Sequence, residues 1–470
     1  MQQFSSVLAS EALRLDPRIT QARQLFLGAL REHQSALTQI RPPIAERKSQ
    51  YQELLETFAA RRGSKLWLPY LGSGIGNGAL VELLDGSVKY DLISGIGVHY
   101  LGHSHPDLMG AVFDAAVNDL VMQGNLQQNK ETLDLLCLLT DLAKMDHCFL
   151  ATSGAMANEN AFKIAFQKRF PANRILAFDH CFAGRTWSLS QVTDKPSFRE
   201  GLPLNVQVDY LPFFDPAHPE ASIQQTVQLL NQYLERYPKQ YAAMLFEFVQ
   251  GENGFYPGSH DFFASLMEIL RKEQVTVIAD EVQTFGRTPA LFAYQYFQLE
   301  KFIDIAVIGK VAQVCATLFN KDHAPHLGLL SQTFTSSTAA IQAALIMLRH
   351  LTEEDYFGPN GKIVKMERAM TARLSQLAKK YPNEVRGPFG IGSMIAFTPL
   401  DGELQRVTQF IHELFDAGVI AFIAGSKPTR ARFLLPVGFL SEHDLDVIIQ
   451  VIEETIVKMK RYKGEKDQKD

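Results

Sequence analysis

The stretch from Val275 to Lys310 constrains the fold more than any other part of this sequence. It contains two short runs rich in Val and Ile, 275–279 and 305–309, and each run leads into one charged residue, Asp280 or Lys310. Short apolar runs separated by helical or loop material are typical of neighbouring parallel strands that are buried on both faces. Functional groups of such sheets gather at the carboxyl ends of the strands. We therefore expect Asp280 and Lys310 to lie close together, although 310 − 280 = 30 positions separate them.

A carboxylate and an amine at adjacent strand ends suit a cofactor with a basic nitrogen on one side and an aldehyde on the other. Pyridoxal phosphate carries both groups. Asp280 would keep the pyridine nitrogen protonated, and Lys310 would form a Schiff base with the aldehyde. From these two residues alone, a structural ion pair at the edge of a sheet is an equally good interpretation.

The residues around this pair favour the cofactor. Residues 278–284 read IADEVQT and are followed by GRT, LFA and a later GK. This pattern resembles the signature of the class III pyridoxal-phosphate aminotransferases, the family of the ornithine, acetylornithine and 4-aminobutyrate enzymes. The resemblance implies an α/β fold of type I, with a large, doubly wound, mostly parallel seven-stranded sheet domain and a smaller α+β domain.

Composition excludes several other classes. The 470 residues are 46% apolar and carry a net charge of −5, which gives no basic surface for nucleic acid. The four cysteines show no CxxC spacing, as expected in a reducing compartment. No run of about 18 apolar residues occurs, and the N-terminal region lacks the apolar core of a signal peptide. We therefore expect a cytoplasmic protein that does not associate with membranes.

We expect three segments along the chain. Residues 1–94 would supply N-terminal helices and a segment that packs with the small domain, including a hairpin around Asp85-Gly86. Residues 95–345 would form the large cofactor-binding domain. Residues 346–470 would form the C-terminal small domain.

A glycine-containing turn at residues 151–165, ATSGAMANENAFKIA, opens a predicted helix. Bare amides at a helix N-terminus bind phosphate, although a capped helix after a strand is also common. The resemblance implies that Ser153, Gly154 and Ala155 hold the cofactor phosphate, chiefly through backbone amides. Met156 stands where the family usually has Glu.

The resemblance also implies the remaining cofactor contacts. Phe182 would stack on the pyridine ring, Val282 would pack beneath the ring, and Gln283 would bind the phenolic oxygen. Thr333 would reach the phosphate of the other subunit. The active unit would therefore be a homodimer with shared active sites.

Substrate contacts follow from the same resemblance. Arg185 is a fork-shaped donor suited to a substrate carboxylate. Arg432 would bind the α-carboxylate of glutamate or 2-oxoglutarate, with Arg430 as its solvent-exposed neighbour, and Glu252 would cover Arg432 when other substrates bind. The two further expected contacts are Ile96 and Gln332.

Together these residues predict an aminotransferase. It would move the amine of an ω-amino acid-type donor, such as N-acetylornithine or 4-aminobutyrate, to 2-oxoglutarate by a ping-pong mechanism. Ile96 stands where the ornithine-specific enzymes have Tyr, which argues against free ornithine.

Three alternatives stay open. An aminomutase would not need Arg432 and Glu252 as a switching pair, and a non-catalytic family member would have lost Lys310 or Asp280. A decarboxylase of the same fold depends on how the substrate is oriented, which the sequence does not specify.

Two histidines, His103 and His105, invite a metal interpretation. The sequence offers no third ligand nearby. We therefore favour a helix-entry role for the GHSHP segment and expect no bound metal.

Overall fold

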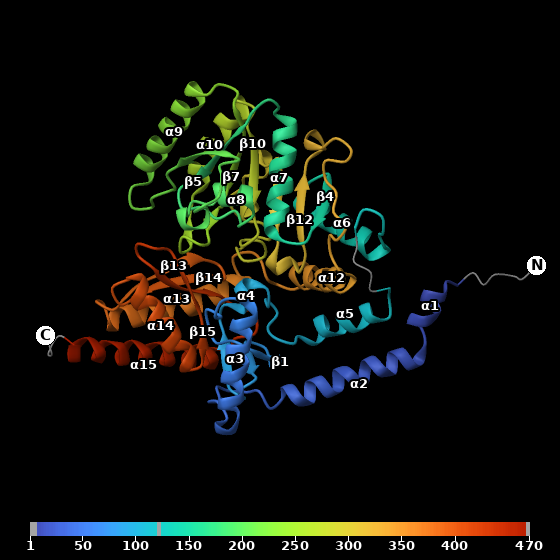
Figure 1. Cartoon of the computed structure of the whole chain (residues 1–470), viewed down its shortest axis with the longest axis vertical. Helices are drawn as coiled ribbons and strands as arrows, with labels where there is room; N and C mark the ends of the chain where they lie inside the picture. Colours follow the sequence, from blue (N-terminus) through green and yellow to red (C-terminus); the bar gives the residue numbers. More distant parts are fainter. Residues whose placement is uncertain (1–6, 120–123, 467–470) are drawn as a thin grey trace, which may run out of the picture.

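The computed structural model describes residues 7–119 and 124–466. These residues form a seven-stranded sheet, two four-stranded sheets and a two-stranded ribbon. Figure 1 shows the large sheet and its helices as one layered unit, with the C-terminal sheets and helices packed below it. The active-site elements lie where the two units meet.

The seven-stranded sheet has the order β4-β12-β11-β10-β7-β5-β6. Its five strands from β11 to β6 are parallel, whereas β12 runs antiparallel to both of its neighbours. This arrangement confirms the predicted mostly parallel sheet of an α/β fold. The strands are β4 (His147–Ala151), β5 (Arg174–Phe178), β6 (Gln207–Leu211), β7 (Tyr241–Phe246), β10 (Thr276–Asp280), β11 (Ile305–Ile308) and β12 (Cys315–Phe319).

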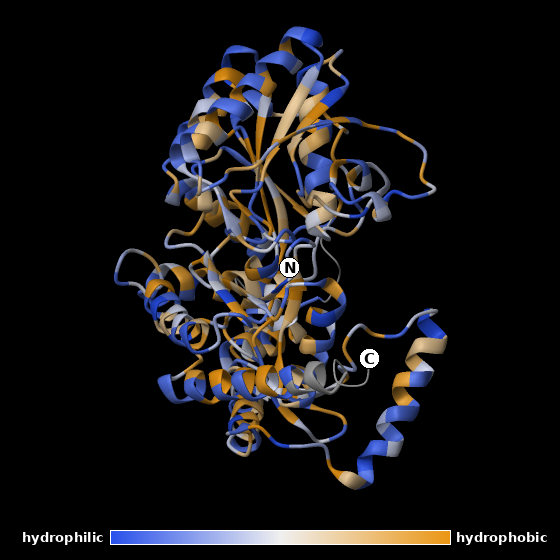
Figure 2. Ribbon diagram, turned by 90° about the vertical axis from the view of Figure 1, so that its left-hand side faces the viewer, coloured by the Kyte–Doolittle hydropathy of each residue, from blue (hydrophilic) through white to orange (hydrophobic). Residues whose placement is uncertain are grey.

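Alternating residues of the central strands enter two different apolar clusters, one on each face of the sheet. In β10, Ile278 packs with the cluster of α7 (Gly154–Lys168), while Val277 and Ala279 pack with the cluster of α10 (His260–Lys272). Figure 2 shows these apolar strands in orange and tan between helices that present polar residues outward. The continuous apolar runs of the sequence therefore reflect burial on both faces.

The predicted hairpin around Asp85-Gly86 is confirmed, because β2 (Leu80–Leu83) pairs antiparallel with β3 (Val88–Asp91). The hairpin belongs to a sheet of order β1-β2-β3-β15, in which β1 spans Gly72–Asn77 and β15 spans Val419–Ile420. The parallel β3–β15 pairing joins the N-terminal segment to the C-terminal part of the chain. Residues of the N-terminal and C-terminal parts of the chain thus share one sheet.

The second four-stranded sheet has the order β13-β14-β17-β16 and is antiparallel. Its strands are β13 (Val385–Ile391), β14 (Met394–Pro399), β16 (Phe422–Ala424) and β17 (Arg430–Leu434). It packs with α13 (Lys362–Lys380) and α14 (Leu404–Asp416), and both of these helices contact α15 (Glu442–Lys466). The strand β17 faces the large sheet and carries Arg432.

The N-terminal helices lie on the outside of the molecule. They are α1 (Ala9–Arg14), α2 (Pro17–Gln34) and α3 (Lys48–Arg62). Figure 1 shows α2 beside α5 (Pro106–Ala116), and the rings of Phe26 and Phe113 stack there at 5.9 Å. No helix in the described part of the chain is long and apolar enough to cross a membrane.

Six further helices, a two-stranded ribbon and several 3-10 turns complete the described chain. The remaining helices are α4 (Ser94–Gly97), α6 (Lys130–Ala143), α8 (Trp187–Val192), α9 (Pro219–Arg236), α11 (Ala293–Tyr296) and α12 (Thr338–Glu353). The two-stranded ribbon pairs β8 (Val249–Gln250) with β9 (Tyr256–Pro257). Single 3-10 turns occupy Ala45–Arg47, Pro196–Phe198, Glu300–Phe302, Lys310–Ala312 and Lys321–His323.

Candidate active site

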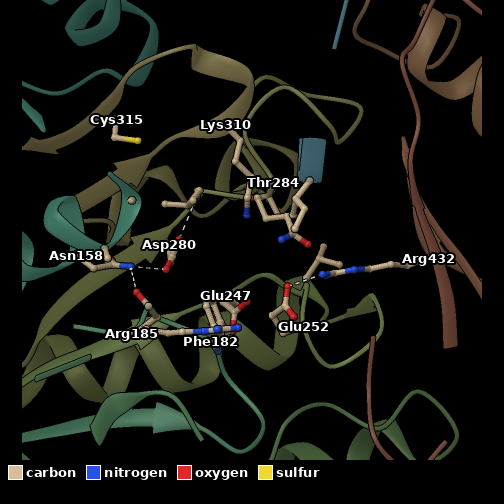
Figure 3. A pocket seen from close by; sticks show the side chains of 18 of the residues that line it. Asn158, Phe182, Arg185, Glu247, Glu252, Asp280, Thr284, Lys310, Cys315 and Arg432 are labelled. Atoms are coloured by element: carbon tan, nitrogen blue, oxygen red, sulfur yellow. Dashed lines mark hydrogen bonds and ion pairs between the residues drawn. The ribbon is translucent and has the colours of Figure 1, made fainter. Parts of the chain in front are cut away.

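A cavity of about 490 Å³ lies at the carboxyl ends of β7, β10 and β11, where the large sheet meets β16 and β17. Side chains from these distant segments point into it in Figure 3. The cavity brings together most of the site residues that the sequence predicts: Ile96, Gly154, Ala155, Phe182, Arg185, Glu252, Asp280, Val282, Gln283, Lys310 and Arg432.

Asp280 ends β10 and Lys310 directly follows Gly309, which comes after β11. The two strands are hydrogen-bonded neighbours, with Asp280 opposite Val307. The buried Asp280 carboxylate accepts hydrogen bonds from Asn158 Nδ2 at 2.7 Å and from the Val282 amide at 3.0 Å. Asp280 and Lys310 therefore enter one cavity from adjacent strand ends, as the strand pattern predicts.

Burial changes the acid–base behaviour of both groups. It lowers the pKa of Lys310 to about 8; Arg432 and Arg287 add to this effect, while Glu252 and Asp280 oppose it. Burial raises the pKa of Asp280, against the hydrogen bonds that Asn158 and Val282 donate to its charged form. Lys310 is therefore set up to lose its proton far more readily than an exposed lysine.

The N-terminus of α7 opens on the same cavity. Ser153 caps this helix, and its Oγ accepts a hydrogen bond from the Met156 amide at 3.1 Å. The first amides of a helix have no acceptor within the helix, so those of Gly154 and Ala155 can serve an anion. A Cβ at Gly154 would lie 2.9 Å from Val282 Cγ1, so the close packing of this turn favours glycine.

Two further cavity residues suit a flat aromatic ligand. Phe182 is half-buried, and its backbone amide is anchored by Glu247 Oε2 at 2.7 Å. The buried Gln283 Oε1 has no hydrogen-bond partner among the described residues. A Cβ at Gly251 would lie 2.2 Å from Gln283 Oε1, so the glycine lets Gln283 fit against the turn.

Arg432 and Glu252 form an ion pair on the side of the cavity opposite the large sheet. The fully buried Arg432 donates from Nη2 to Glu252 Oε1 at 2.7 Å and from Nη1 to the Gly251 carbonyl at 3.1 Å. Burial tends to raise the pKa of Glu252, but Arg432 and then Lys310 hold it below its usual value. The predicted pair therefore forms across 432 − 252 = 180 positions of sequence.

Arg185 is exposed at the cavity rim. Its guanidinium lies 4.1 Å from the centre of the Phe198 ring and 6.0 Å from that of Phe182. Within residues 7–119 and 124–466, no carboxylate forms an ion pair with Arg185. The guanidinium is thus positioned by stacking and available for an external anion.

Ile96 lines the cavity from α4 in an unusual conformation. Its φ is 59° and its ψ 43°, a left-handed geometry that is strained for a β-branched residue. Ser94, Gly95 and Gly97 also have positive φ. The surrounding structure therefore holds this segment against its local preference.

Three predicted residues lie outside the cavity of a single chain. Ser153 stands at its edge as the cap of α7. Gln332 accepts a hydrogen bond through its carbonyl from the Asn125 amide at 3.4 Å, and Thr333 is exposed. Their expected contacts, with substrate for Gln332 and with the partner's cofactor for Thr333, stay predictions.

Arg430 is not the solvent-exposed neighbour of Arg432 that the sequence analysis expects. It is only 3% exposed, and its guanidinium stacks between the rings of Tyr256 and Phe389 at 4.0 and 3.7 Å. It also donates to the Gly254 carbonyl at 2.5 Å. The prediction is wrong because the turn between β8 and β9 covers this face of β17.

Sequence reasoning missed several polar residues of the cavity, among them Asn158 and Glu247. Asn158 donates to Asp280 and also to the Ala183 carbonyl, and thereby joins α7 to both β10 and the Phe182 loop. Glu247 has a pKa that burial, with help from Asp280, raises to about 8. A usable signal was present, because Glu247 is the one acid in the apolar run 242–249.

The predicted helix-entry role of the GHSHP segment is confirmed. His105 is the N-cap of α5, and its Nδ1 accepts a hydrogen bond from the Asp107 amide at 3.3 Å. Ligand atoms of His105, Asp107 and His350 lie within 4.8 Å of one another. The structure therefore brings two possible further ligands, Asp107 and His350, to His105, which the sequence analysis did not expect, while His105 Nδ1 is engaged in the capping bond.

Comparison with known proteins identifies the family. The sequence profile of the class III aminotransferases matches residues 73–456. The chain belongs to this family and is a class III aminotransferase.

Individual relatives agree with this assignment. The chain is 29% identical over 389 residues to the acetylornithine aminotransferase of Methanothermobacter thermautotrophicus, covering 81% of this chain and 92% of that protein. It is 27% identical over 405 residues to that of Methanocaldococcus jannaschii, covering 82% and 93%. The solved lysine aminotransferase of M. tuberculosis has the same fold, with a TM-score of 0.74, 22% identity and coverage of 85% of this chain and 98% of that one.

Proposed function

We propose that this aminotransferase uses pyridoxal 5'-phosphate to move the amine of an ω-amino acid-type donor to 2-oxoglutarate in two half-reactions. The observation that carries the proposal is a single cavity that contains two pairs of oppositely charged residues. Lys310 and Asp280 enter from the large sheet, and the Arg432–Glu252 ion pair enters from the opposite side. The first pair suits the cofactor, and the second suits exchange between unlike substrates.

The residues of the cavity fit this cofactor. The α7 amides suit its phosphate, Asp280 its ring nitrogen, and Phe182 and Val282 its two faces. The unpartnered Gln283 Oε1 is an acceptor and suits the phenolic group in its hydroxyl form. When bound, pyridoxal phosphate supplies an electron-withdrawing ring that stabilises negative charge at the substrate carbon.

Lys310 acts as the general base. With a pKa of about 8, its Nζ is free of a proton in a large fraction of molecules at slightly alkaline pH. It takes the proton from the substrate carbon that bears the amine and returns a proton in the opposite half-reaction. Asp280, held by Asn158 and Val282, keeps a negative charge opposite Lys310.

Substrate exchange depends on Glu252. With Glu252 paired to Arg432, the exposed fork of Arg185 is the free cation for the carboxylate of an ω-amino donor. With Glu252 displaced, Arg432 binds the α-carboxylate of 2-oxoglutarate while Arg185 binds the second carboxylate. One cavity therefore serves two substrates of different shape. Ile96 lines the part of the cavity that would receive the ω-amino donor.

N-acetylornithine is the first donor to test. The two relatives reported above are acetylornithine aminotransferases, although each shares less than a third of its residues with this chain. 4-Aminobutyrate and related ω-amines are the next candidates. Free ornithine is disfavoured by Ile96.

The active unit is proposed to be a homodimer. Thr333 is exposed outside the cavity, and its neighbour Phe334 has 56% of its surface exposed. An exposed aromatic ring beside a residue assigned to the partner's phosphate fits a subunit interface. Light scattering of the purified protein tests this, and a monomer that turns over donors contradicts it. The cytoplasmic location also stays a prediction.

The deciding experiment is a panel of amino donors with 2-oxoglutarate, in which glutamate formation is measured. We expect glutamate to appear with an ω-amino donor and to require both the donor and the oxo acid. Release of carbon dioxide from the donor would instead identify a decarboxylase. Product formation without any oxo acid would identify an aminomutase.

A further inference from the structure

Arg287 is a buried cation without an acid. It lies 287 − 280 = 7 positions after Asp280, and none of its surface is exposed. Among residues 7–119 and 124–466, no carboxylate pairs with it, and its Nε has no hydrogen-bond partner. Burial lowers its pKa to about 10. An unpaired buried charge destabilises a fold, so stability alone does not explain the presence of Arg287 at this position.

One side of the guanidinium holds the segment that carries Ile96. Nη2 donates to the Gly97 carbonyl at 2.9 Å. A Cβ at Gly97 would lie 2.9 Å from Nη2, so the arginine packs directly under the backbone. Gly97, whose carbonyl accepts this bond, is the last of four consecutive residues with positive φ, from Ser94 to Gly97. Arg287 therefore holds the strained backbone that presents Ile96 to the cavity.

The other side holds the turn between β13 and β14. Nη1 contacts Ser393 Oγ at 3.3 Å, and the Arg287 carbonyl accepts from the Ser393 amide at 2.9 Å. The Ser393 carbonyl in turn accepts from the Leu435 amide at 3.0 Å, directly after β17. Gly392 has φ +62°, and a Cβ there would lie 2.0 Å from the Arg287 carbonyl oxygen. Side chain and backbone of Arg287 thus both anchor this turn.

Arg287 lies in the loop after β10, and β10 is the hydrogen-bonded neighbour of β11, the strand that leads to Lys310. Burial is the largest cause of the lowered pKa of Lys310, and Arg432 and Arg287 act in the same direction. The acids that face Lys310, Glu252 and Asp280, act against them. Arg432 is paired with Glu252, whereas no carboxylate in the described part of the chain pairs with Arg287. Its charge is therefore not cancelled locally.

We propose that Arg287 is a positioning residue that ties the Ile96 segment and the strand of Arg432 to the Lys310 end of the large sheet, where its buried guanidinium supplies a positive charge. The inference rests on the proposed function, since Ile96, Arg432 and Lys310 matter together only around one substrate. It adds a further element, the loop after β10, to the substrate-facing side. Arg287 itself is absent from the cavity lining.

Arg287→Lys tests the positioning half. It keeps the charge but replaces a planar fork, and one ammonium does not span Gly97 and Ser393 as the guanidinium does. We expect kcat/KM for the ω-amino donor to fall by roughly 10- to 100-fold, because a small misplacement of substrate-facing groups costs up to about 100-fold. Unchanged kcat/KM for donor and 2-oxoglutarate overturns the positioning role.

Arg287→Met tests the charge half without any turnover. In the chain freed of cofactor, the Lys310 amine is labelled with an amine-reactive reagent at a series of pH values and quantified by peptide mass spectrometry. The native chain should show a midpoint near 8, the pKa of Lys310. Removal of a nearby positive charge favours the protonated amine, so the midpoint should rise in Arg287→Met and stay near the native value in Arg287→Lys. An unmoved midpoint in a folded Arg287→Met overturns this half.

Two further variants keep the test decisive. Arg169→Met removes a partly buried arginine that binds Thr276 at the opposite end of β10, and it should move neither the midpoint nor kcat/KM. If both Arg287 variants fail to fold, Ser393→Ala removes one acceptor while its backbone bonds remain, and native kcat/KM there overturns the positioning role. Because labelling needs no substrate, a wrong donor assignment does not affect that arm.

Discussion

The Lys310–Asp280 pair and the substrate-facing rim, which we define as Ile96, Arg185, Glu252 and Arg432, are assembled in different ways. The pair comes from two neighbouring parallel strands, and the backbone register of β10 and β11 places it. The rim comes from four separate segments, and side-chain contacts such as the Arg432–Glu252 ion pair place it. The register of two paired strands is fixed in the folded protein, whereas an ion pair between two side chains can open.

This difference separates chemistry from selection. A change at the strand ends removes a group whose position nothing else reproduces, so it should abolish turnover with every substrate. A change on the rim alters which substrate is held and should act unequally on donor and 2-oxoglutarate. The predictions below test this contrast, beginning with the strand ends.

Lys310→Ala should have the largest effect. In the proposed function it removes the amine that would bond pyridoxal phosphate and move the proton, and loss of a general base alone costs about 10²–10⁴-fold. We expect no visible absorbance from a cofactor bonded to the chain and a loss of turnover in both half-reactions. Cys315→Ala is the matched control, because Cys315 lines the same cavity without an assigned role, and its spectrum should be native. An unchanged spectrum in Lys310→Ala contradicts the assignment.

Asp280→Asn should have the next largest effect. The amide keeps an acceptor for the Val282 amide but removes the charge from the strand end. We expect turnover to fall by roughly 100-fold in both half-reactions, the size of effect seen when one preorganised electrostatic group is removed. The measurement is kcat for each half-reaction under single turnover. A loss confined to one substrate would place Asp280 on the rim.

Sequence reasoning succeeds at the strand ends for a physical reason. Doubly buried strands give continuous apolar runs, and the first charge after each run stands at the carboxyl end of its strand, as at Asp280 and Lys310. The seven-stranded sheet is predictable on the same grounds. Glu247 obeys a related rule, since it is a lone acid at the end of the apolar strand β7, but no motif drew attention to it.

The rim is harder to predict, because its environment comes from elements that are distant in sequence. Arg430 and Arg432 share a face of β17, yet the turn between β8 and β9 buries Arg430 between two rings. The identity of Arg432 and Glu252 as a pair came from family resemblance and not from spacing. The role of Arg287 depends on contacts with Gly97 and Ser393 that no local pattern contains.

Glu252→Gln should produce a smaller and unequal effect. The amide keeps the shape but loses the charge that covers Arg432, a charge-assisted bond of roughly 1.5–3 kcal/mol. We expect the ratio of kcat/KM for the ω-amino donor to that for glutamate to fall about 10-fold, the size of effect that corresponds to about 1.4 kcal/mol. Glutamate gains because Arg432 is already free. Equal changes for both substrates would contradict a switching role for Glu252.

Arg185→Lys should have the smallest effect, and it should weaken the ω-amino donor more than glutamate. A point charge replaces a planar fork, and stacking on the Phe198 ring is lost. We expect the ω-amino donor to lose several-fold in kcat/KM, about 1 kcal/mol at an exposed stacked site, while glutamate loses less because Arg432 holds its other carboxylate. Arg199→Lys is the control, since Arg199 lies nearby and donates to the Thr193 carbonyl outside the cavity lining. Equal losses for donor and glutamate would show that Arg185 does not discriminate between them, and the contrast between strand ends and rim would then rest on Glu252 and Arg432 alone.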